Sequence, residues 1–134
     1  MKIIATSGYF DPLHIGHIRL FKESKKLGDK LVVLLDGDVS AVKKKGKVFM
    51  PQDERKEIIE NLSCVDEVII HNNTAEALDK LKPDVFTKGG DKRSFSDLPM
   101  SEKKVAEKNK IQVIFLVGGD KVQSSSWLLK NYGL

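Results

Sequence analysis

The stretch Gly8-Tyr9-Phe10-Asp11-Pro12-Leu13-His14-Ile15-Gly16-His17 decides how the rest of this sequence is interpreted. It follows a short apolar run, Lys2–Thr6, that is typical of a buried strand, and it leads into Ile15–Leu27, where apolar residues recur at roughly helical spacing. The start of such a helix offers unpaired backbone N–H groups and the positive end of the helix dipole. His14 and His17 lie one turn apart there, so both project to the same side and predict a polyphosphate site.

The alternation of short apolar runs and helical patterns continues along the chain. The expected strands are Lys2–Thr6, Leu31–Leu35, Glu67–Ile70, Asp84–Thr87 and Gln112–Leu116, and the expected helices are Ile15–Leu27, Gln52–Leu62, Thr74–Leu81, Met100–Asn109 and Ser124–Tyr132. Pro51, Pro83 and Pro99 each fall at a boundary, where a missing amide proton is tolerated. Strands that alternate with helices predict a doubly wound α/β fold, a three-layer sandwich around a five-stranded parallel sheet.

In sheets of this kind, ligands bind outside the carboxyl ends of the strands. The loops expected there are Ser7–His14, Asp36–Met50, Lys88–Leu98 and Val117–Gln123. These four loops are therefore where we look for binding residues.

Composition narrows the class of protein. The 134 residues are 40% hydrophobic and 31% charged, which is typical of a globular chain that forms one domain over residues 1–134. The 23 Lys and Arg outnumber the 19 Asp and Glu and favour anionic partners, such as phosphorylated ligands or nucleic acids. Cys64 is the only cysteine, so no disulfide can form within the chain. The opening apolar run is too short for a signal peptide or a membrane span, so we expect a cytoplasmic protein without membrane insertion.

The pattern G-x-F-D-x-x-H-x-G-H in the quoted stretch resembles the signature of the cytidylyltransferase-like nucleotidyltransferase superfamily. Three further motifs follow in the family's order: a helix opening P-x-x-x-R that ends at Arg55, Lys88-Gly89-Gly90-Asp91, and Ser124-Ser125-Ser126. The resemblance implies a Rossmann-like sheet in 3-2-1-4-5 order and a homodimer. It also implies Mg²⁺-dependent transfer of AMP or CMP from ATP or CTP to a small phosphorylated acceptor, with release of pyrophosphate.

Histidines suit this chemistry. A substrate phosphate is already an anionic nucleophile, so the protein has only to orient in-line attack and stabilise the charge that builds on pyrophosphate. His14 and His17 are the expected catalytic residues, and the rest of the motif is expected to bind nucleotide: Gly8, Tyr9, Phe10, Asp11 and Gly16. Two helix-capping histidines or half of a zinc site are the alternatives. Asp11 could hold Mg²⁺ indirectly, orient a histidine or cap the turn.

The segment Asp36–Met50 has four lysines in five positions. A solvated, mobile loop is the plainest interpretation of such a run. Because relatives use lysines of this loop to neutralise the triphosphate, Lys45 and Lys47 are catalytic candidates. Asp38 is a candidate for the acidic residue that relatives have here, or a turn residue. Arg55 is expected to contact phosphate or brace the edge of the sheet, with an exposed helix arginine as the alternative.

The two later motifs complete the predicted site. Glycines at Gly89 and Gly90 let backbone amides approach a ligand, with Lys88 beside them, and Asp91 could bind a ribose or sugar hydroxyl. A simple glycine turn is the alternative. Hydroxyls at a helix start form an anion site, so Ser125 is a catalytic candidate and Ser124 and Ser126 are expected to bind nucleotide. An N-cap would account for one serine only.

The acceptor is the least determined part of the prediction. The K-G-G-D run is similar to that of heptose-1-phosphate adenylyltransferase domains, which favours ATP and a sugar 1-phosphate such as heptose 1-phosphate. Glycerol-3-phosphate cytidylyltransferases share the opening motif, but the arginine of their R-T-x-G-I-S-T-T ending is absent from 119–126 here.

Proteins of other classes fit the sequence less well. A non-catalytic nucleotide sensor would usually lose one of the two histidines. The P-loop and G-x-G-x-x-G patterns are absent from the sequence, and few aromatic residues and no reader motif argue against nucleic acid.

Overall fold

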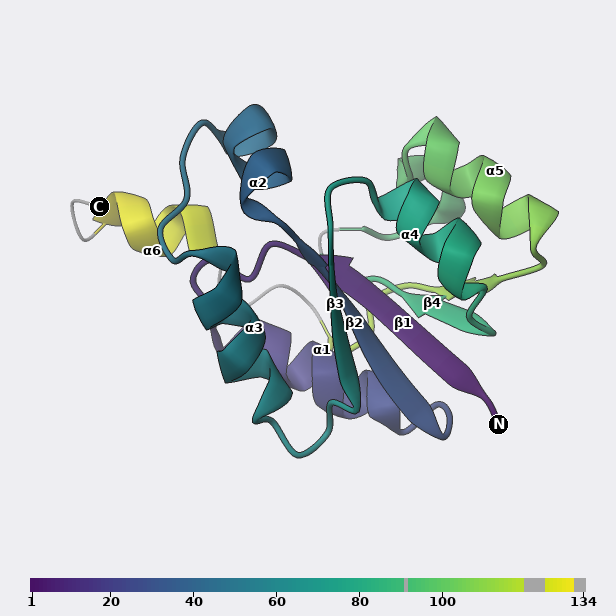
Figure 1. Ribbon diagram of the computed structural model, residues 1–134. Coiled ribbons are helices and arrows are strands. Elements are labelled where there is room, and N and C mark those ends of the chain that lie inside the picture. Colours follow the sequence, from purple (N-terminus) through teal and green to yellow (C-terminus); the bar gives the residue numbers. More distant parts are fainter. Residues whose placement is uncertain (91, 120–124, 132–134) are drawn as a thin grey trace.

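The computed structural model describes residues 1–90, 92–119 and 125–131, and parallel strands form its central sheet (Figure 1). The strands are β1 (Ile3–Gly8), β2 (Lys30–Asp36), β3 (Glu67–His71), β4 (Val85–Thr87) and β5 (Gln112–Ile114). Their order is β3-β2-β1-β4-β5, and each neighbouring pair is parallel. This order confirms the predicted Rossmann-like α/β fold, in which the direction of strand addition reverses beside β1.

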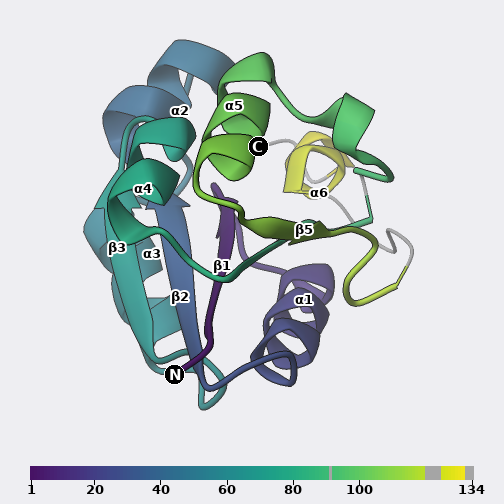
Figure 2. The same cartoon turned by 90° about the vertical axis from the view of Figure 1, so that its right-hand side faces the viewer.

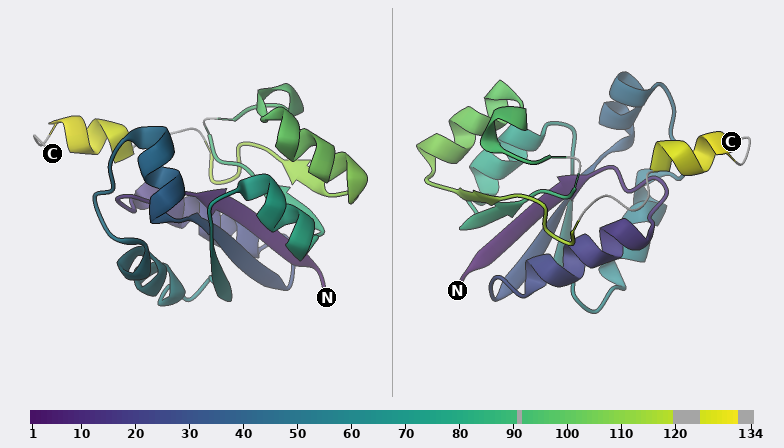
Figure 3. Two further views of the ribbon diagram at one scale, coloured as in Figure 1. Left: turned by 45° about the horizontal axis from the view of Figure 1, so that its top comes forward. Right: turned by 180° about the vertical axis from the view of Figure 1, so that it is seen from behind.

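Helices cover both faces of the sheet. They are α1 (Ile15–Lys25), α2 (Asp38–Lys45), α3 (Gln52–Glu60), α4 (Thr74–Leu81), α5 (Met100–Lys108) and α6 (Ser125–Asn131), with a 3₁₀ helix at Phe95–Asp97. α1 and α3 pack on one face, and α4 and α5 pack on the other (Figure 2). α2 and α6 lie beyond the carboxyl ends of the strands, away from the N-terminus (Figure 3). None of the described helices is long and apolar enough to cross a membrane.

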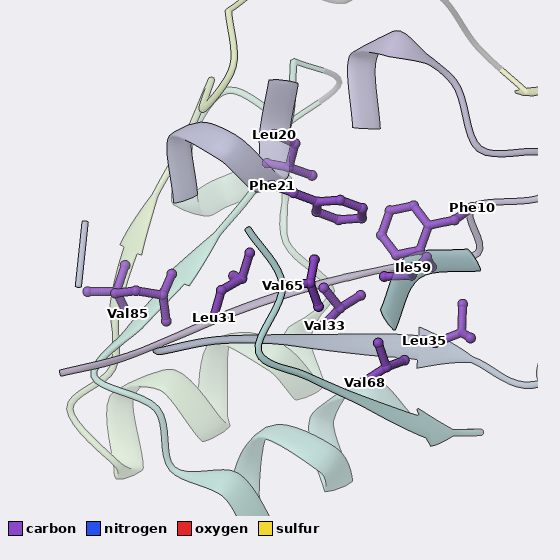
Figure 4. Packing of buried hydrophobic residues seen from close by; sticks show 11 residues of the cluster. Phe10, Leu20, Phe21, Leu31, Val33, Leu35, Ile59, Val65, Val68 and Val85 are labelled. Atoms are coloured by element: carbon purple, nitrogen blue, oxygen red, sulfur yellow. The ribbon is translucent and has the colours of Figure 1, made fainter. Parts of the chain in front are cut away.

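Strand β2 shows why its sequence is a continuous apolar run. All five residues of Leu31–Leu35 are fully buried, because helices cover both of its faces. Leu31, Val33 and Leu35 belong to the core under α1 and α3, together with Phe21 and Ile59 (Figure 4). Val32 and Leu34 belong to the core under α4 and α5. The two cores hold the carboxyl ends of the strands in a fixed register.

The largest departure from the predicted elements is α2, which occupies half of the segment expected to be a loop. Asp38 lies in its first turn, three lysines lie in its last turn, and both complement the helix dipole. Gly46 ends the helix in the left-handed conformation with φ 87°. Acidic start, basic end and terminal glycine were the available signals. The apolar pattern of a buried helix face is missing, because Val39 and Val42 of α2 are exposed.

Other boundaries moved by a few residues. β5 ends at Ile114 rather than Leu116, because Leu116 has a positive φ of 56° that ends the extended backbone. In α3, the apolar Ile58 is exposed, and Arg55 takes a buried position. The start of the last predicted helix, at Ser124, lies outside the described residues.

Gly118 lets the loop after β5 lie directly on α1. Its φ is 86°, and a Cβ there would lie 2.9 Å from the backbone nitrogen of Leu20. Gly119 has a similar φ of 89° but open space around it. The first glycine therefore serves a close backbone approach, and the second serves only the turn.

We expect Gly118→Ala to destabilise the protein more than Gly119→Ala. Both changes place a Cβ at positive φ, which costs about 1–2 kcal/mol. Only Gly118→Ala also forces two backbones apart, which adds roughly 1–3 kcal/mol. Urea denaturation of the two variants measures the difference. Equal losses would show that the loop does not pack on α1.

Candidate active site

A cavity of about 510 Å³ lies at the carboxyl ends of the strands, where the fold predicts a ligand site. Predicted residues that line it are Gly8, Tyr9, Phe10, His14, Gly16, His17, Lys45, Lys88, Gly89, Gly90 and Ser125. Residues not singled out from the sequence also line it, among them Asp36, Lys44, Thr74 and Glu102. Lys47, Asp11, Asp38 and Arg55 were predicted for the site but do not line the cavity.

The two histidines form a stacked pair at the start of α1. Their ring centroids are 3.7 Å apart and their planes differ by 23°. His14 is the N-cap residue: its Nδ1 accepts from the backbone N–H of Gly16 at 3.1 Å. His17 completes a capping box, because its Nδ1 accepts from the backbone N–H of His14 at 3.1 Å. A neutral imidazole that accepts at Nδ1 has its proton on Nε2, so each ring retains a donor atom.

Both histidines cap the helix, which is one of the alternative roles that the sequence left open. Capping uses only one nitrogen of each ring, and both residues line the cavity. Gly16 is required here, because a Cβ would lie 2.9 Å from Cε1 of His14. Gly16 therefore leaves space for the imidazole of His14, and nucleotide binding at Gly16 stays a prediction.

Phe10 packs against the histidine pair from the hydrophobic core. Its side chain is buried, with its ring edge-on to that of His17 at 4.8 Å and to that of Phe21 at 5.0 Å. A Cβ at Gly8 would lie 2.8 Å from Cζ of Phe10. Gly8 thus accommodates the phenyl ring, and because Gly8 also lines the cavity, its binding of nucleotide stays a prediction.

Asp11 anchors the segment between α2 and α3. Its carboxylate is buried and accepts from the backbone N–H groups of Phe49 and Met50, each at 2.7 Å. Of the three roles left open by the sequence, the structure shows a bracing role close to that of a turn cap. Both carboxylate oxygens are engaged in this bracing, so the structure gives no support to a role for Asp11 beside Mg²⁺.

Arg55 is buried, with 1% of its surface exposed, so the alternative of an exposed helix arginine is wrong. Its guanidinium donates to the carbonyl oxygens of Tyr9 at 2.7 Å, Asp36 at 2.8 Å and Met50 at 2.8 Å. It also donates to Oδ1 of Asp38 at 2.8 Å. Arg55 therefore has the bracing role, which was one of its two predicted roles, and it braces the loops around the cavity. Asp38 is its hydrogen-bond partner and does not line the cavity.

The lysine run divides between cavity and surface. Lys44 and Lys45 line the cavity, and Lys47 does not. The Nζ atoms of Lys44 and Lys45 lie 5.9 and 4.4 Å from the ring centroid of Tyr9. Burial raises the pKa of the Tyr9 hydroxyl, and the negative charge of Asp36 adds to this. Tyr9 therefore stays protonated and orients two lysines over the cavity, of which Lys45 was predicted and Lys44 was not.

The K-G-G-D run contributes three described residues. Lys88, Gly89 and Gly90 line the cavity, and Asp91 lies outside the described residues. Nζ of Lys88 is 3.8 Å from Oε1 of Glu102, and both side chains are largely buried. The run thus brings a positive charge to the cavity beside a carboxylate from α5.

The serine cluster is described only at Ser125. This residue begins α6, is buried, and donates from Oγ to the carbonyl oxygen of Pro12 at 2.8 Å. The bond fastens the start of α6 to the histidine loop. Ser124 and the side chain of Ser126 lie outside the described part of the structure, so their predicted roles stay predictions.

The described residues hold no group of three His, Cys, Asp or Glu side chains that could ligate a metal. His14 and His17 therefore have no third ligand among residues 1–90, 92–119 and 125–131. Nothing in that part of the chain supports the zinc alternative.

His71 ends β3 beside the cavity. Burial lowers its pKa from the ordinary value of 6.5, and the carboxylate of Asp36 opposes this shift. Neither ring nitrogen has a hydrogen-bond partner among the described residues. The histidine is therefore neutral in the folded protein at neutral pH.

We expect Arg55→Met to lower the free energy of unfolding by roughly 3–5 kcal/mol, because it leaves a carboxylate and three carbonyl groups without their donor. Lys56→Met is the matched control on the next residue of α3, where a partly exposed pair with Glu60 contributes only about 0–1 kcal/mol. Urea denaturation measures both. Similar losses in the two variants would contradict the bracing role.

We expect His71→Gln to make stability less dependent on pH in acid. The folded state excludes a proton that the unfolded state binds as pH falls through 6.5, so wild type loses stability below that pH. The His71→Gln variant has no such group and should not lose stability in this way. Unfolding free energies from about pH 7.5 to 5 measure it in both proteins. Parallel profiles would show that His71 titrates normally when folded.

Comparisons with known proteins agree with this geometry. The family model described as cytidylyltransferase-like matches residues 5–131. The bifunctional protein HldE of Desulfatibacillum aliphaticivorans is 46% identical over 93 residues, which cover 66% of this chain and 19% of that protein. FAD synthase of Pyrococcus abyssi is 36% identical over 117 residues, covering 84% of this chain and 78% of that protein. This chain spans about a fifth of the length of the HldE relatives it matches.

A solved structure supports the same conclusion. The lipopolysaccharide core biosynthesis protein from Thermoplasma volcanium GSS1 is 31% identical, with a TM-score of 0.70, and the match covers 86% of this chain and 95% of that one. The fold, the ordered motifs and the family model agree over nearly the whole chain. The chain belongs to the cytidylyltransferase-like family, which confirms the family predicted from its motifs.

Proposed function

We propose that this chain transfers a nucleotidyl group from a nucleoside triphosphate to the phosphate of a small acceptor and releases pyrophosphate. The observation that supports this most directly is the stacked histidine pair, whose Nδ1 atoms are held by helix caps inside a cavity that also receives Lys44 and Lys45. Such a site holds cationic and N–H donor groups close together, as a triphosphate requires.

The reaction needs no base from the protein. An oxygen of the acceptor phosphate attacks the α-phosphorus in line, a new P–O bond forms, and the bond from the α-phosphorus to the bridging oxygen breaks. Pyrophosphate leaves with the electron pair. Nε2–H donors of His14 and His17 and the ammonium groups of the lysines stabilise the charge that builds on it.

Mg²⁺ fits this site as part of the substrate rather than as a resident ion. The described residues supply no three-ligand metal group, and Asp11 is engaged by backbone N–H groups. Triphosphate oxygens would therefore hold most of the ion's coordination shell, as is usual for Mg²⁺. The protein's part is to bind and orient the charged complex.

For the acceptor we favour a sugar 1-phosphate, such as heptose 1-phosphate, with ATP as the donor. The K-G-G-D run and the 46% identity to an HldE protein support this choice. The similarity to FAD synthases makes a flavin phosphate the second candidate. Glycerol 3-phosphate with CTP is a third, and a homodimer stays a prediction.

The test uses variants that keep the helix caps. His14→Asn and His17→Gln are two single variants. Each retains a side-chain acceptor that suits the N-cap or N3 position, but each removes one imidazole. We expect each to lower kcat about a hundredfold or more, because a transition-state donor is lost. Pyrophosphate release is measured with ATP and CTP against heptose 1-phosphate, flavin mononucleotide and glycerol 3-phosphate.

Lys22→Gln, on the exposed last turn of α1, is the control and should retain wild-type turnover. Thermal unfolding of each variant checks that the caps survive. Turnover within about threefold of wild type in His17→Gln would contradict the proposed role, since such donors usually contribute far more. Tight nucleotide binding without turnover on any acceptor would instead indicate a nucleotide sensor.

A further inference from the structure

The two ends of the cavity differ in chemistry. The end at α1 and α6 presents histidines and helix starts, which suit phosphates. The opposite end presents two carboxylates, Asp36 from the end of β2 and Glu102 from the first turn of α5, with Thr74 from the start of α4. Carboxylates repel phosphate, so this end is built for a different part of a ligand.

Strand register explains how these groups meet. Asp36 pairs with His71 in the parallel ladder, so both side chains leave the same face of the sheet. That face is the one to which Leu34 belongs, and α4 and α5 cover it. The first turns of the two helices therefore come to the same edge as Asp36, although these residues are far apart in sequence.

Glu102 has a buried carboxylate oxygen without a hydrogen-bond donor in the described part of the chain. It is 9% exposed, it lines the cavity, and its buried Oε1 has no hydrogen-bond donor among the described residues. Nζ of Lys88 forms an ion pair with this oxygen at 3.8 Å, which is beyond hydrogen-bond distance. A buried carboxylate oxygen without a donor is costly, so a donor from a ligand would be strongly favoured.

Asp36 is the second carboxylate of this end, and it already has one hydrogen bond. It is 4% exposed, and its Oδ1 accepts from the hydroxyl of Ser40 at 2.8 Å. His71 is its neighbour across the ladder, but burial keeps that imidazole neutral, and it adds no compensating charge. Carboxylates can accept several hydrogen bonds each, which leaves capacity for a ligand.

The charges at this end select among ligand groups. Two carboxylates, Asp36 and Glu102, share the cavity lining with four lysines, Lys44, Lys45, Lys88 and Lys92, so positive charge is in excess. With lysines in excess, the site would repel an ammonium group. Hydroxyl groups suit it better, because each can donate to a carboxylate and accept from a lysine.

We propose that Asp36 and Glu102 form an acceptor subsite that binds the hydroxyl groups of a polyhydroxylated phosphate, with its phosphate directed toward the histidine end. This inference rests on the proposed nucleotidyl transfer, which requires an acceptor beside the triphosphate. It identifies the class of acceptor by its hydroxyl groups, and it makes Glu102 a residue that determines specificity.

Calorimetric binding tests the subsite without requiring turnover. Wild type with a non-hydrolysable ATP analogue is titrated with glucose 1-phosphate, inositol 1-phosphate, ethyl phosphate and phosphoethanolamine. We expect at least one polyol phosphate to bind about tenfold or more tightly than ethyl phosphate or phosphoethanolamine, because it gains hydrogen bonds to charged groups. Equal or weaker binding of both polyol phosphates would overturn the subsite.

Glu102→Gln and Asp36→Asn keep the side-chain volume and remove the charge. We expect each to raise the Kd of the favoured polyol phosphate about tenfold, while the Kd of the ATP analogue and of ethyl phosphate stays within about twofold. Glu107→Gln, on the exposed last turn of α5, is the matched control and should bind like wild type. Equal effects of Glu102→Gln and Glu107→Gln would overturn the proposal.

Pyrophosphate release on the same four acceptors separates the two proposals. Selective binding of polyol phosphates without any transfer would contradict the proposed function but support the subsite. Transfer only onto ethyl phosphate or phosphoethanolamine would support the function and overturn the subsite.

Discussion

The buried guanidinium of Arg55 is the constraint on which the rest of the site depends. It donates to carbonyl oxygens in the loop after β1, at the end of β2 and before α3, and to the carboxylate at the start of α2. A planar group with five N–H donors can join several segments at fixed angles, which a lysine cannot do. Asp11 adds two bonds to the same segment before α3. Together they hold the histidine loop and α2 in one frame, so charged side chains reach the cavity from both.

The histidine pair shows how a structural bond can serve a chemical purpose. Each Nδ1 atom is engaged in capping α1, and this engagement places the proton on Nε2 and limits rotation of the ring. Phe10 packs against His17 from the core and limits it further. Pre-organised donors need no reorganisation during reaction, which is the property that electrostatic stabilisation requires. Capping and catalysis are therefore compatible uses of the same side chains.

The cavity combines charged side chains whose burial would be unfavourable if each were alone. Lysines from α2 and from the loop after β4 lie near carboxylates from β2 and α5, and each charge lowers the cost of burying the other. The net positive charge of the chain still favours anionic substrates. A phosphate and a polyol portion of one molecule could thus occupy different ends, which is the basis for the acceptor class proposed above.

The sequence alone determined the order of elements, the fold class, the family and the histidine pair, because each depends on residues close together in the chain. Periodicity reports burial along a segment, and a motif such as H-x-G-H defines its geometry within one helical turn. Asp91, Ser124 and Ser126 remain predictions from that level.

Only the tertiary structure decided that Arg55 is a buried brace, that Asp11 anchors a backbone segment, and that Lys44 rather than Lys47 lines the cavity. It alone brought Asp36 and Glu102 to one cavity. Their proximity depends on strand order and on crossovers that place the starts of distant helices at one edge of the sheet, and no local pattern in the sequence encodes that distance.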